Sequence, residues 1–482
     1  MFNDDQAFKN DYNAGHCIDC GSALCRVRRS DPVAIDENKI KAFWNSMIMK
    51  SASTDSVDSG RPDHPPFNWP EKPHVKLAPT GADRQLSELE STMQDMVHSF
   101  AEKVMRPIGI ALDKMTPDEV IAPGSPYWTY LEELKKLEIT PKTFMDLSPE
   151  ERGRLFPIVM EEMGWGDGGL SIIYGACSLP PLMALVFNRT FLIERFPDTL
   201  RGCWAITEPD HGSDSLDISR QAFHAQGNYG RPNCVATIRG DKVVLNGQKA
   251  AWVSNAPTAE VCVLFCSADT GDGADTQHGV CILVPMDAPG VTRGKPLDKI
   301  GQRALPQGEV YFDNVELTTD YLVAGPEDYQ RAVYLIHAEA NSQMACVWTG
   351  AARAAYELAF EYAHQRKQGG VPIIRHQAVA ARLFHMYRKV EASRALAQRV
   401  ALHNHTSEIP SLQSAMAAKV TATQTAFEVA SEALQVFGGN GLTKEYQIEK
   451  ILRDARASMI EDGCNDILAL KAGFNMIDPD LF

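Results

Sequence analysis

Residues 204–214 read WAITEPDHGSD, and they stand where the hydrophobic pattern of the chain changes from helical to β-type. The pair Gly212–Ser213 places backbone N–H groups beside a hydroxyl after a turn, which suits a phosphate or an electron-rich ring edge. A plain loop that leaves a strand fits these residues equally well. The stretch therefore predicts a domain boundary near residue 203 and a candidate binding loop directly after it.

The segment that follows alternates short β-branched and aromatic runs with Gly, Asn, Asp and Pro. Examples are KVVLNG, AEVCVLFCSA, GVCILVPM and GEVYFDNVEL. Asn246–Gly247 is a hairpin-turn signal, and Trp252 and Ser254 then project from one strand face. Trp252 could cover a flat cofactor ring, although an isolated strand tryptophan is more often part of a core. We expect residues 203–326 to form an antiparallel, barrel-like β-domain.

Helical periodicity flanks this β-region on both sides. Upstream, apolar residues recur at three- and four-residue spacing from Leu86 onward, and Pro107 is expected to end the first helix. Downstream, Ala-rich segments such as CVWTGAARAAYELAFEYAHQR favour long helices. The expected fold is α+β and multidomain, with an all-α domain over 83–202, the β-domain over 203–326 and a four-helix bundle over 327–482.

Residues 1–82 are rich in Ser, Asp, Pro and Gly and lack periodicity, so a flexible extension or linker is expected there. The segment HCIDCGSALC within it has a spacing that could hold zinc through His16, Cys17, Cys20 and Cys25. A second ligand pair at the usual separation is absent, so we expect no metal site. Most of the eleven cysteines are expected to be reduced and buried.

The net charge and the N-terminal sequence predict which partners are unsuitable and where the protein is located. A formal charge of −15 argues against a general affinity for nucleic acid or anionic lipid. We find no apolar stretch of 18 or more residues, so no membrane span is expected. The start MFNDDQAFKNDYN has neither an apolar core nor the Arg-rich pattern of a transit peptide. A cytoplasmic location is therefore expected.

Two further motifs lie near the end of the chain. QVFGGNGLTKEY, residues 435–446, follows an Ala-rich helix, and its glycines suit a helix C-terminus with close approach of a nucleotide. No βαβ unit surrounds them, which excludes a Rossmann site. RDARASMIEDGCND, residues 453–466, places acidic residues before a glycine, where a carboxylate is either a general base or a solvated cap.

Taken in order, these motifs closely resemble those of the acyl-CoA dehydrogenase family over about residues 84–475. The matching segments are 207–214, 246–255, 301–310, 366–377, 435–441 and 453–463. The resemblance implies an FAD enzyme that forms a 2-enoyl-CoA: a carboxylate takes the α proton of an acyl-CoA thioester, and the β hydrogen leaves as hydride to flavin N5. It also implies an electron-transfer flavoprotein as acceptor and a homodimer or homotetramer, with a heteromer as the alternative.

The resemblance also implies site residues, position by position. The cofactor set around the flavin comprises Trp204, Ala205, Ile206, Thr207, Gly212, Ser213, Trp252, Val253, Ser254, Cys464 and Asp466. Arg366 is expected to neutralise the FAD pyrophosphate. The ADP portion is expected to be held across a subunit boundary by His376, Gln377, Gln435, Gly438 and Gly439. The substrate is expected to contact Ser213, Asn341 and Gly463.

The catalytic position departs from the family pattern, which has Glu in a Tyr-Glu-Gly-Thr turn. Here the aligned residue is Asp462, one methylene shorter, and we expect it to be the catalytic base. Glu461 and Glu339 are the alternatives. Because neighbouring side chains diverge, only one of Glu461 and Asp462 is expected to face the flavin. The family usually has Arg where this chain has Asn341.

These departures keep two other functions open. A chain without a base would be a non-catalytic or FAD-only partner subunit of a heteromeric dehydrogenase. A flavin oxidase of the nitroalkane-oxidase kind is the other alternative on the same scaffold. The Asp at the base position and the missing helix Arg together favour a branched, cyclic or otherwise bulky acyl group over a straight fatty chain.

Overall fold

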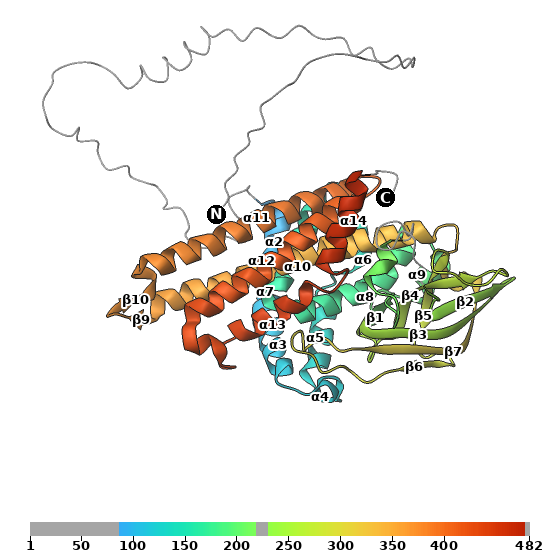
Figure 1. Cartoon of the computed structure of the whole chain (residues 1–482), viewed down its shortest axis with the longest axis horizontal. Coiled ribbons are helices and arrows are strands. Elements are labelled where there is room, and N and C mark those ends of the chain that lie inside the picture. Colours follow the sequence, from blue (N-terminus) through green and yellow to red (C-terminus); the bar gives the residue numbers. More distant parts are fainter. Residues whose placement is uncertain (1–85, 218–229, 478–482) are drawn as a thin grey trace, which may run out of the picture. The chain divides into compact units, whose positions relative to one another are not determined.

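The computed structural model of the chain describes residues 86–217 and 230–477. All the described residues belong to one compact unit of the chain, Pro73–Phe482. Along the described residues the order is helical, β and helical again, as predicted (Figure 1). The expected flexible extension over 1–82, with its candidate zinc ligands His16, Cys17, Cys20 and Cys25, lies outside the described residues.

Most of the helices that precede the sheet begin at polar caps. Ser87, Thr116 and Ser148 each accept from a backbone N–H three residues on, and the side chain at that third position bonds back to the cap. The helices are α2 (Glu88–Phe100), α3 (Arg106–Asp113), α4 (Pro117–Ile121), α5 (Pro126–Lys135), α6 (Pro141–Met145), α7 (Pro149–Gly166), α8 (Gly168–Val186) and α9 (Thr190–Arg195).

The first helical run does not end at Pro107. A π-helical segment, Ala101–Met105, joins α2 to α3, and Pro107 lies in the first turn of α3. Proline lacks the N–H that a regular helix needs four residues after a carbonyl, and its ring crowds that carbonyl. A wider π turn directly before the proline relieves both problems, so the predicted stop was wrong and the chain continues as a helix.

The β-domain is one eight-stranded sheet in the order β6-β7-β3-β2-β4-β5-β8, with β1 also paired to β4. Its strands are β1 (Gly202–Ala205), β2 (Cys234–Arg239), β3 (Lys242–Ser254), β4 (Val261–Asp269), β5 (Gly279–Pro285), β6 (Val291–Arg293), β7 (Gln307–Thr318) and β8 (Leu322–Ala324). Most pairs are antiparallel, as predicted, but β4 runs parallel to β1 and β2. The short connection between Ser254 and Val261 starts β4 at the end of the sheet where β3 stops, so β4 runs opposite to β3 and therefore parallel to β2.

Asn246–Gly247 is not the hairpin turn that its sequence suggests. β3 continues through it, and the register with β7 shifts at this point. Gly247 has a φ of 126°, and a Cβ there would lie 2.0 Å from the carbonyl oxygen of Asn233. The conformational freedom of the glycine therefore serves a bulge and a close backbone approach rather than a turn.

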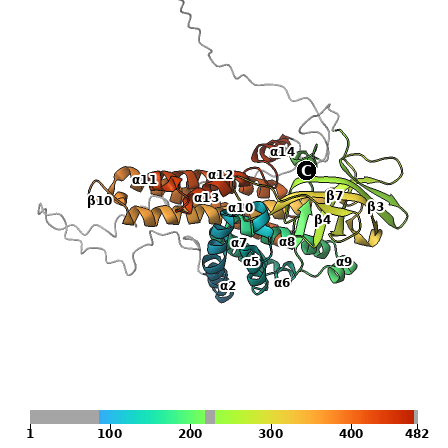
Figure 2. The ribbon, with the colours of Figure 1, turned by 90° about the horizontal axis from the view of Figure 1, so that it is seen from below.

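Strand β4 is buried on both faces and joins the sheet to the helices. One face, Val261, Val263 and Phe265, packs against α8, α9 and the beginning of α10. The other face, Cys262, Leu264 and Cys266, belongs to the interior of the β-domain. This period-two alternation brings α8 against the sheet, as Figure 2 shows. The cysteines within the described residues form no disulfide, and most are buried, as predicted.

Helix α8 corrects one expectation. By length and composition it is apolar enough to cross a membrane, whereas no such segment was expected. Its apolar window is 67% buried inside the fold, where α8 packs on β1 and on α10. The core helix of a soluble protein passes the same test, and we interpret α8 as a core helix.

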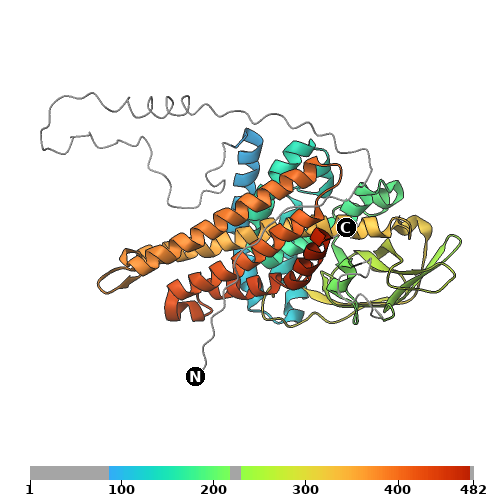
Figure 3. The same cartoon turned by 45° about the horizontal axis from the view of Figure 1, so that its top comes forward.

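Three long helices dominate the C-terminal region, and they run side by side in Figure 3. The helices are α10 (Tyr329–Gln365), α11 (Gln377–Thr406), α12 (Leu412–Phe437), α13 (Ile448–Ser458) and α14 (Asn465–Ile477). The fourth position of the predicted bundle is taken by the short α13, which packs on α12 and α10. A two-stranded hairpin, β9 (Lys367–Gln368) and β10 (Val371–Pro372), connects α10 to α11.

Candidate active site

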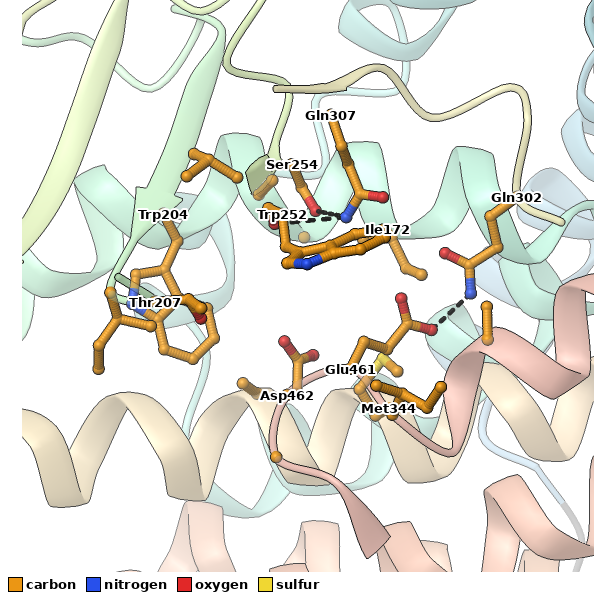
Figure 4. A pocket seen from close by; sticks show the side chains of 18 of the residues that line it. Ile172, Trp204, Thr207, Trp252, Ser254, Gln302, Gln307, Met344, Glu461 and Asp462 are labelled. Atoms are coloured by element: carbon orange, nitrogen blue, oxygen red, sulfur yellow. Dashed lines mark hydrogen bonds between the residues drawn. The ribbon is translucent and has the colours of Figure 1, made fainter. Parts of the chain in front are cut away.

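A cavity of about 820 Å³ lies where the β-domain, α8, α10 and the loop between α13 and α14 meet. The sequence-predicted residues in its lining are Trp204, Ile206, Thr207, Gly212, Ser213, Trp252, Val253, Ser254, Asp462 and Gly463. Figure 4 shows that Asp462 faces Trp204 and Trp252 across this space. The fold thus brings together the loop after β1, the end of β3 and the loop after α13.

The β-domain side of the cavity suits a flat aromatic ring. Trp252 is 60% exposed, although it is a large apolar residue on a central strand, because its indole forms part of the cavity wall. The interpretation of Trp252 as an ordinary core residue is therefore wrong. Behind it, Gln307 Nε2 donates to Ser254 Oγ at 3.1 Å and holds the end of β3. A planar cofactor would cover this otherwise solvated apolar surface.

The loop after β1 is anchored at both ends. A buried ion pair between Lys249 Nζ and Glu208 Oε1, at 2.6 Å, holds its start against β3. The N–H of Gly212 donates to Asp214 Oδ1 at 2.6 Å, so it is used within the loop. The Ser213 Oγ accepts from the N–H of Cys464 at 3.1 Å, which leaves its own O–H proton available as a donor. Ser213 therefore ties this loop to the loop that carries Asp462.

Both acidic residues of the loop after α13 line the cavity, contrary to the expectation that only one would (Figure 4). The chain turns here instead of running extended, so neighbouring side chains are not forced to opposite sides. Asp462 has a φ of 52°, a left-handed conformation that non-glycine residues rarely adopt. Such backbone strain is typical of functional sites.

The surroundings of these two carboxyl groups shift their proton affinities. Burial raises the pKa of Asp462 to about 6, against the opposing effect of the Lys419 amine. Burial and the neighbouring Asp462 raise the pKa of Glu461 to about 8. Gln302 Nε2 donates to Glu461 Oε1 at 2.5 Å. At neutral pH, Asp462 is therefore the ionised member of the pair and Glu461 retains most of its proton.

Two buried side chains hold the backbone of this loop. Lys419 Nζ donates to the carbonyl of Gly463 at 2.8 Å and to Asn465 Oδ1 at 2.9 Å. Asn341 Nδ2 donates to the carbonyl of Asp462 at 3.3 Å. The side chain of Asn341 is fully buried beneath the loop and is not among the residues that line the cavity. The substrate contact expected of Asn341 stays a prediction, and the structure shows instead a role in positioning Asp462.

The remaining predicted residues lie away from the cavity. Ala205 is buried inside β1, and Asp466 is an exposed residue in the first turn of α14. Glu339, the alternative base, is not in the lining, and the charged group that acts on it is Arg152. An exposed group lies where the long helices meet β9, β10 and the glycine turn after α12: Arg366, His376, Gln377, Gln435, Gly438 and Gly439. Their assignment to an ADP moiety stays a prediction.

Several cavity residues were not predicted. Lys299, Gln302 and Gln307 come from the segment before and at the start of β7. The motif at 301–310 marks this segment, but it does not by itself indicate a role for these side chains. Helices α8 and α10 supply a largely apolar wall that includes Ile172, Gly175, Ala340, Gln343 and Met344. Helical periodicity marks such residues as buried, but it does not say that they border a cavity.

Comparisons with known proteins agree with this arrangement. Two family descriptions match, "Acyl-CoA dehydrogenase, middle domain" over residues 203–315 and "Acyl-CoA dehydrogenase, C-terminal domain" over residues 339–475. The benzylmalonyl-CoA dehydrogenase of Aromatoleum aromaticum is 32% identical over 325 residues, which span 65% of this chain and 80% of that protein.

Solved structures with a similar fold include butyryl-CoA dehydrogenase from Megasphaera elsdenii, with a TM-score of 0.71 and 24% identity over 82% of this chain and 100% of that chain. A glutaryl-CoA dehydrogenase from Mycobacterium smegmatis in complex with FADH2 gives a TM-score of 0.68 and 21% identity over 84% and 99% of the two chains. At identities below 25%, these two likenesses support the fold alone.

Proposed function

This chain belongs to the acyl-CoA dehydrogenase family, a family of oxidoreductases, and from that premise we propose that it removes the α and β hydrogens of an acyl-CoA thioester, with Asp462 as the base. The observation that carries the proposal is the position of Asp462. Its carboxylate faces the cavity opposite the residues expected to border the flavin ring, from a strained turn held by Lys419 and Asn341.

The lining fits FAD as the cofactor. The exposed indole of Trp252, the backbone around Ile206 and Thr207, and the hydroxyl of Ser213 form one continuous wall of the cavity. Bound there, FAD would supply the acceptor for the β hydrogen and its electron pair. Arg366 and the exposed residues around the glycine turn after α12 would hold its phosphate and adenosine part, in the way that the family resemblance implies.

The residues of this chain account for the proton and for the developing charge. The Asp462 carboxylate takes the α proton while the carbon–carbon double bond forms, and its raised pKa brings it close to the working pH. Within the described residues, no group accepts from the N–H of Asp462 or of Gly463, and both residues line the cavity. These two donors are placed to stabilise negative charge on the thioester oxygen.

An anaerobic titration tests the proposal. The full chain, purified with FAD, should lose its flavin absorbance when a suitable acyl-CoA is added from a panel of straight, branched and alicyclic esters. Asp462→Asn should keep bound FAD but bleach at least about 100-fold more slowly. Glu461→Gln should bleach within about tenfold of the unaltered protein. Asp146→Asn, which alters an exposed carboxylate outside the cavity, is the matched control.

The titration also separates the rival functions. A protein that binds FAD but is bleached by no ester would be a partner subunit without activity of its own. Rapid peroxide formation with a nitroalkane would indicate an oxidase. Full bleaching by Asp462→Asn would overturn the assignment of the base. We further propose an electron-transfer flavoprotein as the electron acceptor and a homodimer or homotetramer as the assembly, which acceptor-dependent turnover and sedimentation would test.

A further inference from the structure

Gln343 is the polar residue that stands out in the helical wall of the cavity. The wall opposite the β-domain consists of one face of α8 and one face of α10, with Ile172, Ala176, Ala340, Met344 and Val347 among its apolar members. Gln343 lies among them on α10, half-buried. Among the described residues, none forms a hydrogen bond with its side chain. The amide faces the cavity with its donor and acceptor unused by the protein, and it would need a hydrogen-bonding partner once a ligand displaces water from this wall.

The position of this amide is built into the packing of the two helices. Gly175 of α8 faces Gln343, and a Cβ at Gly175 would lie 2.5 Å from Nε2 and 2.9 Å from Oε1 of the glutamine. Any larger residue at 175 would therefore displace the amide. The missing side chain on α8 leaves the space in which the amide of α10 rests against the wall of the cavity.

Charge decides what kind of group fits. The parts of α8 and α10 that line the cavity contain no Lys or Arg. His337, the titratable residue of this wall, donates its Nδ1 proton to the carbonyl of Val333 at 2.7 Å and is neutral, because burial lowers its pKa to about 4. Glu461 and Asp462 border the same cavity. The cations of the cavity lie on other elements: Lys299 Nζ donates to the carbonyl of Leu305 and to Gln307 Oε1, and Arg456 belongs to α13. A carboxylate held between α8 and α10 would therefore be desolvated beside two acids with no cation on either helix, whereas a neutral oxygen carries no such cost.

We propose that Gln343 selects acyl-CoA esters whose acyl group carries a neutral hydrogen-bonding oxygen, such as a hydroxyl or a keto group, beyond the β carbon. The proposal rests on the proposed function, because it takes the acyl group into the space between α8 and α10. The carboxamide suits both oxygens: its Nε2 donates to a keto group, and its Oε1 accepts from a hydroxyl.

The test compares matched pairs of esters. The holoprotein is titrated calorimetrically with 2-enoyl-CoA esters of graded chain length, which the proposed reaction does not consume. Each hydroxy or keto ester is paired with its hydrocarbon analogue and with the corresponding carboxylate. The unaltered protein should bind the oxygenated member roughly tenfold or more tightly than the hydrocarbon, and the carboxylate most weakly. The same ratios should appear in kcat/KM with the saturated esters.

Two variants and one control isolate the amide. Gln343→Leu keeps a similar volume and should bring the ratio of oxygenated to hydrocarbon affinity to about one. Gly175→Ala should reduce the ratio too, because the new Cβ displaces the amide, and alanine does not weaken the helix. Gln424→Leu, at an exposed residue of α12 whose amide bonds to Glu428, should leave the ratio unchanged.

The outcomes distinguish this proposal from the proposed function. An unaltered protein that binds both members of each pair equally would overturn the role of Gln343, even if its flavin is bleached by acyl-CoA esters. Equal weakening of all esters by Gln343→Leu would also overturn it, because the amide would then serve a part common to every CoA ester. A preference for oxygenated esters that Gln343→Leu abolishes, without bleaching by any saturated ester, would support the site and refute the dehydrogenation.

Discussion

Within the described residues, one pair of adjacent carboxylates is buried in the helical core and another is half-buried at the cavity, and the fold treats them in opposite ways. Glu161 and Glu162 of α7 lie against two buried arginines: Arg353 pairs with both acids, and Arg394 pairs with Glu161. Although burial opposes ionisation, Arg353 and His98 lower the pKa of Glu162 to about 2. The first pair is thus a fixed ionic contact among α2, α7, α10 and α11.

The second pair, Glu461 and Asp462, has no arginine partner within the described residues, and the pKa of each acid is raised. Lys419, whose charge acts on both acids, bonds to the carbonyl of Gly463 and to Asn465 instead of to the carboxylates. A pair of adjacent carboxyl groups therefore stabilises the fold at the first place. At the second place it provides a proton acceptor whose pKa is close to neutral pH. The difference lies in whether cations reach them, not in the acids themselves.

The largest expected effect comes from removing the cation of the first pair. Arg353→Met should lower the free energy of unfolding by about 3–5 kcal/mol, because two buried carboxylates lose their shared partner. Urea unfolding near neutral pH measures it. Arg154→Met, which breaks an exposed pair with Glu150, is the control and should cost less than about 1 kcal/mol. If the two variants behave alike, the first pair does not stabilise the fold.

The second pair should respond in the opposite direction. In the folded protein Asp462 has its pKa raised to about 6, so the fold binds its proton more tightly than the unfolded chain does. The stability from this group is fully present below its unfolded pKa and is lost as the pH rises through about 6. Asp462→Asn should therefore raise the free energy of unfolding by about 1–3 kcal/mol near pH 8 and have little effect near pH 4.

Unfolding curves of the Asp462→Asn protein and the unaltered protein at both pH values check this expectation. A variant that is less stable than the unaltered protein near pH 8 would show that the ionised carboxylate is compensated after all. The comparison between the two pairs would then lose its basis.

The smallest effect concerns His98, at the edge of the first pair. Its hydrogen bond to Glu162 raises its pKa, so its contribution to stability is present below about pH 6.5 and is lost as the pH rises through the folded value. The side chain is 37% exposed, and solvent screens the pair. His98→Gln should cost less than about 1 kcal/mol near pH 5 and less still near pH 9. A larger loss at the higher pH would contradict this assignment.

Much of the fold follows from local patterns in the sequence. The short unbroken apolar run of β4 predicts a strand buried on both faces, and the long Ala-rich run of α10 predicts a helix. The prediction was wrong where one local signal is compatible with two structures. Gly247 in the pair Asn246–Gly247 can adopt the positive φ that either a turn or a bulge requires. The pairing of β3 with β7 selects the bulge.

The candidate site was predictable only in part. The order of motifs placed Trp252, Ser213 and Asp462 at one cavity, and the structure brings them together there. It did not reveal that Glu461 shares the cavity, because this depends on the left-handed conformation of Asp462. Nor did it reveal Gln343, whose exposure depends on a glycine that lies far away along the chain, on α8. Contacts between distant segments carry this information, and local spacing does not.

Helix α10 has a consequence for how this chain can diversify. It runs without interruption over 37 residues, from the wall of the cavity to the hairpin that precedes α11. One inserted or deleted residue after Val347 would turn the remaining helix by about 100° and move it by about 1.5 Å, so every side chain beyond would meet the wrong neighbour. Point substitutions in α10 change single contacts. An insertion or deletion would instead shift the part of α10 beyond the cavity relative to the part that lines it. Length variation is far better tolerated in exposed turns such as the one between β4 and β5.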